Sequence, residues 1–144
     1  MYKKKRILAV VLARSGSKGI KNKNLKKINS IPLVGYAGKL LSKIKIIDKK
    51  IISTDSQKIG KIGVQYGLDY FFKRPKYLSG SKISDEKVLN HALAITEKLK
   101  NKRFDVVVSI PPTSPLRKKN EIVLSIKKLI NEKYDSVWSI SEID

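Results

Sequence analysis

Hydrophobic residues fall into two kinds of segment that alternate along this chain. Short, continuous runs rich in valine and isoleucine are typical of strands covered on both faces in a parallel sheet. Longer stretches with apolar residues every three or four positions are typical of amphipathic helices. The runs predict strands at residues 6–13, 50–53, 69–72, 105–110 and 136–140. The longer stretches predict helices at residues 33–45, 57–66, 85–100 and 120–131.

This order of elements predicts an α/β layered domain with a mostly parallel sheet and right-handed crossovers. Ser56 and Ser84 stand just before predicted helices, where serine is a favoured N-cap. His91 lies in the middle of a predicted helix, so we expect a structural or surface histidine. We expect Trp138, in the last predicted strand, to belong to the core.

The sequence of 144 residues is long enough for one domain with a substantial core. It ends just after the last predicted strand, and a strand in that position normally needs a helix or another strand to cover it. We therefore expect these residues to be the front part of a longer protein.

The composition excludes several classes of site. The chain has no cysteine, which excludes disulfides, cysteine-ligated zinc and cysteine nucleophiles, and its single histidine excludes a multi-histidine metal site. The longest apolar run near the start, residues 7–13, is far too short to span a membrane, and no export signal follows from it. We expect a cytoplasmic protein without a membrane partner.

The net charge of +20 arises from 32 basic and 12 acidic residues and favours a polyanionic partner. However, 27 of the basic residues are lysine and only five are arginine, and they are spread along the whole chain. Nucleic-acid readers rely more on arginine and on aromatic stacking. A dedicated nucleic-acid surface is therefore the less favoured interpretation of the charge, although it stays open.

Three polar segments follow predicted strands, at residues 14–24, 54–56 and 111–117. Ligands of parallel α/β sheets bind at the carboxyl ends of the strands, so these segments are candidates for one site. In the first segment, Gly16 and Gly19 allow successive backbone N–H groups to point at one anion. The spacing matches neither the Walker loop nor the dinucleotide fingerprint. A solvated basic turn is the alternative interpretation.

The motifs in these segments resemble those of the acylneuraminate cytidylyltransferases, also called CMP-sialic acid synthetases. The resemblance rests on ARSGSKG at residues 13–19 followed by Lys23 and Asn24, ISTDS at 52–56, Arg74-Pro75 followed by Leu78, and PTSPLR at 112–117. It covers essentially the whole chain. It implies a three-layer Rossmann-like nucleotidyltransferase fold, truncated at its C-terminus, with residues 1–144 as the nucleotide-binding N-terminal part of a single domain.

The resemblance also implies a reaction, in which CMP passes from CTP to an acidic nonulosonic sugar of the sialic type and pyrophosphate is released. It assigns catalysis to Arg14 and Lys23. The implied nucleotide-binding residues are Arg14, Ser17, Lys18, Lys23, Asn24, Arg74 and Ser84, and the implied sugar-binding residues are Thr113, Ser114 and Arg117. Simpler roles stay open: an exposed loop cation for Arg74, a helix cap for Ser84 and a turn-holding carboxylate for Asp55.

Several departures from the family pattern leave parts of this picture open. Pro111 stands where the family usually has a glutamine before the PTSPLR motif, so the sugar could be a sialic, pseudaminic or legionaminic acid, with Kdo matching the ARSGSKG loop less well. Magnesium is expected from the family, but the family's metal-binding aspartates and its dimer-forming segment lie beyond residue 144. The metal ligands are therefore unassigned, and an inactive nucleotide-binding remnant is the alternative function.

Overall fold

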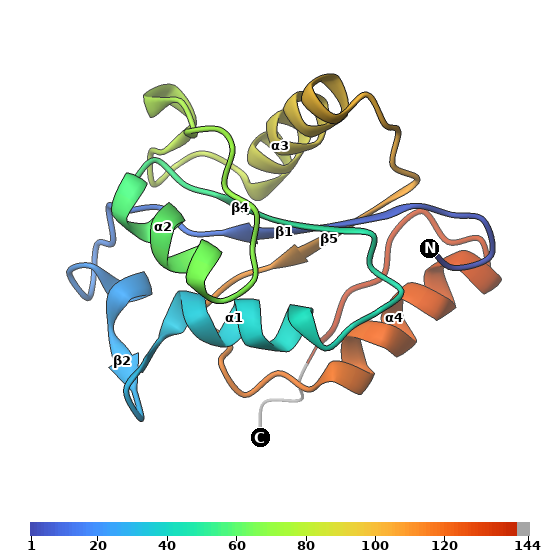
Figure 1. Ribbon diagram of the computed structural model, residues 1–144, viewed down its shortest axis with the longest axis horizontal. Helices are drawn as coiled ribbons and strands as arrows, with labels where there is room; N and C mark the ends of the chain where they lie inside the picture. The colour runs from blue at the N-terminus through green and yellow to red at the C-terminus, as the bar shows by residue number, and fades with distance from the viewer. Residues whose placement is uncertain (141–144) are drawn as a thin grey trace.

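The computed structural model describes residues 1–140 and places a parallel sheet of three strands between two layers of helices (Figure 1). The strand order is β4 (Lys49–Ser53), β1 (Ile7–Leu12), β5 (Val106–Ile110). The central strand β1 therefore pairs on both sides, and its Val10 lies opposite Ile51 of β4 and Ser109 of β5. The α/β class and the layered, parallel architecture expected from the sequence are confirmed.

The two faces of β1 pack against different helices. On one face lie α1 (Leu33–Ser42), α2 (Gln57–Gln65) and α4 (Lys119–Asn131), and on the other lies α3 (Asp85–Lys100) (Figure 1). Alternate residues of β1 serve the two layers: Ile7, Ala9 and Val11 join the larger cluster, and Leu8 and Val10 join the smaller. All five are completely buried, which explains the unbroken apolar run in the sequence.

Short elements fill the connections between these strands and helices. Two 3₁₀ turns, η1 (Lys23–Leu25) and η2 (Lys76–Leu78), and an antiparallel hairpin of β2 (Lys27–Ile28) and β3 (Ile31–Pro32) were not predicted. The hairpin turns at Asn29 and Ser30, both with positive φ, a combination typical of tight two-residue hairpin loops. Strands of two residues carry too little hydrophobic pattern to be found in a sequence.

Two predicted strands are wrong. Residues 69–72 form only a single bridge, between Asp69 and Ile51, and residues 136–140 form no strand. Trp138 is 83% exposed and does not belong to the core of the described residues. Val137, Trp138 and Ile140 make that segment apolar, but it pairs with no strand of the described residues. The predicted helices are confirmed with small shifts; α1, for example, ends at Ser42 rather than at residue 45.

The two serines predicted as helix caps behave differently. The Ser56 hydroxyl accepts a hydrogen bond from the Ile59 amide at 3.3 Å and caps α2. Ser84 occupies the N-cap position of α3, but its side chain makes no capping bond. No helix within residues 1–140 is sufficiently long and apolar to cross a membrane.

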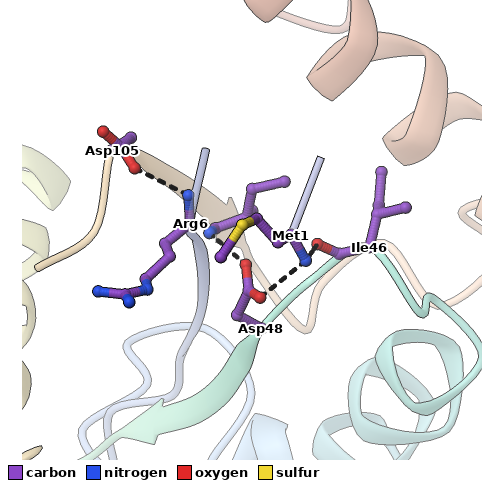
Figure 2. Close-up of polar contacts among 6 residues, drawn as sticks. Met1, Arg6, Ile46, Asp48 and Asp105 are labelled. Carbon is purple, nitrogen blue, oxygen red and sulfur yellow. Dashed lines mark hydrogen bonds and ion pairs between the residues drawn. The ribbon is translucent and has the colours of Figure 1, made fainter. Parts of the chain in front are cut away.

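Carboxylates fix the amino ends of the strands, as Figure 2 shows. The Asp48 carboxylate accepts a hydrogen bond from the Ile7 amide at 2.8 Å and lies 2.7 Å from the Met1 amino group. The Asp105 carboxylate accepts a hydrogen bond from the Arg6 amide, also at 2.8 Å. The starts of β4 and β5 are thus both tied to the start of β1. This arrangement leaves the opposite ends of the strands free for a ligand.

Gly38 lies at the closest approach of α1 to the end of α2. A methyl group at its Cβ position would sit 2.5 Å from the backbone carbonyl oxygen of Tyr66. We predict that Gly38→Ala lowers the free energy of unfolding by about 1–3 kcal/mol through overpacking, although alanine is the better helix former. Urea denaturation measures this, with Lys39→Ala, an exposed neighbour in the same helix, as the matched control. Equal stability of both variants would contradict the close packing.

His91 on α3 packs edge-on against the ring of Phe72, and its buried Nδ1 has no hydrogen-bond partner in the structure. Burial and the nearby Arg74 guanidinium lower the pKa of His91. The neutral ring therefore stabilises the fold above the unfolded pKa of about 6.5, and this stabilisation is lost as the pH falls below that value.

We predict that the urea midpoint of the wild type drops between pH 7.5 and pH 5.5. The non-titrating variant His91→Gln should show a smaller drop over the same interval. An identical pH dependence in both proteins would mean that other groups govern the acid response.

Candidate nucleotide-binding site

A cavity of about 390 Å³ opens at the carboxyl ends of the strands. It is lined by the loop after β1, by the segment from Arg74 to the first turns of α3, and by the turn after β5. The predicted site residues in its wall are Arg14, Ser17, Lys18, Lys23, Asn24, Arg74 and Thr113. Its volume is in the range of small-molecule sites. The convergence of the polar segments after β1 and β5, expected from the sequence, is confirmed. The segment after β4 does not line the cavity, but it forms hydrogen bonds with Ser15 and Arg74.

Three predicted site residues lie outside the wall of the cavity. Ser84 is exposed at the start of α3, although its neighbours Ile83 and Asp85 line the cavity. Ser114 and Arg117 lie in the turn that leads from Thr113 to α4, where the Arg117 amide donates a hydrogen bond to the Ser114 carbonyl at 3.3 Å. Their proposed contacts with ligand stay predictions.

The loop after β1 is anchored at both ends by side chains. At its start, the Ser15 amide and hydroxyl both donate hydrogen bonds to the Asp55 carboxylate, at 2.8 and 2.7 Å. At its far end, the side-chain nitrogen Nδ2 of Asn24 donates a hydrogen bond to the Arg14 carbonyl oxygen at 2.9 Å. Asn24 is 6% exposed and belongs to η1. The glycine-containing loop is thereby closed into a defined turn over the cavity.

Arg74 is a buried cation rather than an exposed loop residue. It is 4% exposed, and its Nε and one terminal nitrogen donate to the hydroxyl and the carbonyl of Ser53, at 3.0 and 2.5 Å. Its own amide donates to the Thr54 carbonyl. Ser53 is the last residue of β4 and Thr54 follows it, so the end of this strand positions the guanidinium in the wall of the cavity.

The charges of the site are strongly unbalanced. Four cations, Arg14, Lys18, Lys23 and Arg74, line the cavity, and Asp85 is the one carboxylate among its described lining residues. Burial lowers the pKa of Arg74, while the carboxylates of Asp55 and Asp85 act in the opposite direction. Such a surplus of positive charge in a concave site favours an anionic ligand.

The Asp55 carboxylate stays ionised despite its partial burial. Burial raises its pKa, but the two hydrogen bonds from Ser15 and the nearby Arg74 outweigh this effect, and the pKa lies below its ordinary value. The carboxylate is therefore ionised at neutral pH, where it accepts both hydrogen bonds from Ser15.

Two features of the site were not predicted from the sequence. Asp85, which is not among the residues that the sequence assigns to the site, lines the cavity. Asp55, for which the sequence leaves a turn-holding role open, holds the neighbouring loop. The sequence signal for Asp55 was its position directly after a buried strand, but nothing in the sequence pointed to Ser15 as its partner.

The described residues do not form a protein-held metal centre. No group of three or more histidine, aspartate or glutamate side chains gathers within residues 1–140. Asp85, the carboxylate in the cavity wall, stands alone among cations. The magnesium implied by the family resemblance thus lacks a fitting set of ligands in this part of the chain. The positive charge of the site comes from the cations of the chain itself.

The fold and the site can be set beside known proteins. The chain is 33% identical, over 91% of its length, to the post-translational flagellin modification protein B of Campylobacter coli, and spans 56% of that protein. It is 34% identical, over 94% of its length, to an N-acylneuraminate cytidylyltransferase of Escherichia coli, and spans 31% of it. The chain thus covers about half or less of these relatives.

Among solved structures, the fold resembles that of a CMP:2-keto-3-deoxy-manno-octonic acid synthetase complexed with CTP. The TM-score is 0.71, and the superposition covers 89% of this chain and 48% of that one, at 14% sequence identity. At this identity the likeness concerns the fold, and it supports the Rossmann-like architecture.

A family model described as cytidylyltransferase matches residues 8–143, which includes every segment that lines the cavity. The motifs, the layered parallel sheet and the cationic site at the strand ends agree with this match, and the chain belongs to the cytidylyltransferase family.

Proposed function

We propose that the protein binds CTP in this cavity and transfers CMP to an acidic nonulosonic sugar of the sialic type, releasing pyrophosphate. The observation that carries the proposal is the single cavity that joins the cationic loop after β1, the buried Arg74 and the PTSPLR turn after β5. The family to which the chain belongs supports CTP as the nucleotide, and the N-acylneuraminate relative supports the class of sugar.

The triphosphate is assigned to the loop after β1. Arg14, Lys18 and Lys23 line the cavity from this loop, and Gly19 lines it beside them without a side chain that could keep phosphate oxygens from its backbone. Ser17 adds a hydroxyl donor in the same wall. The wall formed by Asn24, Arg74 and the start of α3 then receives the ribose and the base, which is the role proposed for Ser84 as well.

The reaction requires little covalent chemistry from the protein. The anomeric hydroxyl oxygen of the sugar forms a bond to the α-phosphorus of CTP, and the bond from that phosphorus to the bridging oxygen breaks. The hydroxyl proton is released, and the bonding electrons leave with pyrophosphate. Arg14 and Lys23 lower the barrier by stabilising the negative charge that develops on the phosphate oxygens.

The sugar is assigned to the turn after β5. Thr113 lines the cavity, Ser114 follows it directly, and Arg117 stands four positions after it in the chain. A guanidinium such as that of Arg117 suits the sugar's carboxylate because the two groups can form paired, charge-assisted hydrogen bonds. Pro111, also in the cavity wall, offers no side-chain hydrogen bond to the sugar.

We predict that, in buffer containing Mg²⁺, the 144-residue chain releases pyrophosphate only when CTP and an acidic nonulosonic sugar are both present. A coupled phosphate assay with N-acetylneuraminate measures this, with pseudaminic, legionaminic and Kdo sugars compared in parallel. Binding of CTP without turnover would indicate a nucleotide-binding remnant. Binding to DNA and RNA that weakens steeply with salt, without affinity for CTP, would contradict the proposal in favour of nucleic-acid binding.

We predict that Arg14→Ala and Lys23→Ala each weaken CTP binding by roughly tenfold, because each removes a charge-assisted contact with phosphate. Lys39→Ala, which removes the same charge from the exposed face of α1, should leave the affinity within about twofold. Isothermal titration calorimetry of the three variants measures the difference. Equal losses in all three would show that only the overall positive charge of the chain attracts the nucleotide.

A further inference from the structure

We propose that Asp55 is a positioning residue that clamps the loop after β1 in the conformation that receives phosphate. This inference rests on the proposed function, since it gives the clamped loop the task of binding the triphosphate. Asp55 itself does not line the cavity, so it acts through Ser15 rather than through contact with the ligand.

The geometry of the clamp is complete on both sides. Each carboxylate oxygen of Asp55 accepts one hydrogen bond, one from the Ser15 amide at 2.8 Å and one from the Ser15 hydroxyl at 2.7 Å. Ser15 directly follows Arg14, which lines the cavity. The two hydrogen bonds therefore fix the backbone one residue away from a cation assigned to the phosphates, so a displacement of Ser15 also displaces Arg14.

The clamp is built on a firm base at the end of β4. Ser53 and Thr54 are completely buried, and the Thr54 hydroxyl accepts a hydrogen bond from the Ser56 amide at 3.1 Å. Ser53 receives the guanidinium of Arg74 from the other side. Residues 53–56 thus hold both the loop after β1 and the buried arginine. They thereby fix the spacing between two walls of the cavity.

The negative charge of Asp55 by itself disfavours the binding of an anion in the cavity. Asp55 lies close enough to Arg74 to affect its pKa, so its negative charge acts on the same region that attracts the anion. If charge were its only influence, removing it would strengthen phosphate binding. If it positions the loop, removing it weakens binding. The two roles therefore predict changes of opposite sign.

The test compares Asp55→Ala with Asp69→Ala. Both remove one carboxylate, and Asp69 pairs with Lys49 outside the cavity. Alanine at position 55 can accept neither hydrogen bond from Ser15, whereas an asparagine could keep both. The probes are CTP and inorganic tripolyphosphate, measured by calorimetry on the 144-residue chain. We expect Asp55→Ala to weaken both by about tenfold and Asp69→Ala to change them by less than twofold. Ser15→Ala, which keeps the amide bond and loses the hydroxyl bond, should weaken both by a smaller factor.

A second readout follows the clamp without any ligand. The Ser15 amide should exchange its hydrogen with solvent faster in Asp55→Ala than in the wild type, while amides of β1 keep their protection. Unchanged or tighter tripolyphosphate binding in Asp55→Ala, or unchanged Ser15 exchange, would overturn the clamp. If the wild type binds tripolyphosphate but not CTP, the proposed function fails, and these two measurements still decide the role of Asp55.

Discussion

The structure depends on the burial of one strand. β1 is hydrogen-bonded on both sides and covered on both faces, so residues 7–11 are completely buried and Leu12 at its end lines the cavity. Polar chemistry is therefore concentrated at the two ends of the strand. Carboxylates lie at the amino end, where they hold the neighbouring strands in register (Figure 2). The cationic loop follows the carboxyl end, where it lines the cavity.

Hydrogen bonds to neutral groups keep the binding site ordered despite its surplus of positive charge. Arg74 is fixed by neutral oxygens of Ser53, and Arg14 has its carbonyl bound by Asn24, so neither depends on an ion pair for its place. Their charges remain available to a ligand. Asp55 is a carboxylate among these cations, and both of its oxygens accept hydrogen bonds from Ser15.

The sequence predicted those features that follow from local pattern. The buried strands β1, β4 and β5 and the four helices arise from residues close together in the chain, and all appear in the structure. The meeting of the polar segments after β1 and β5 follows from the rule that parallel strands end at the same edge of a sheet, and it appears as well. The errors concern partners distant in sequence. Residues 69–72 and 136–140 carry apolar residues but form no strand with the described residues, and Asp55 has a partner 40 residues away that no local pattern identifies.

The central position of β1 has a consequence for how the chain acquires its structure. The bonds that fix its start join residues 41 positions apart toward β4 and 99 positions apart toward β5. During synthesis, this strand therefore emerges before both of its neighbours, and it waits for β5 until the 99 further positions that separate Arg6 from Asp105 have been made. Contacts of such long sequence separation slow folding and prolong the exposure of apolar backbone. The element that makes the folded protein rigid is thus the one most exposed to misassociation on the ribosome.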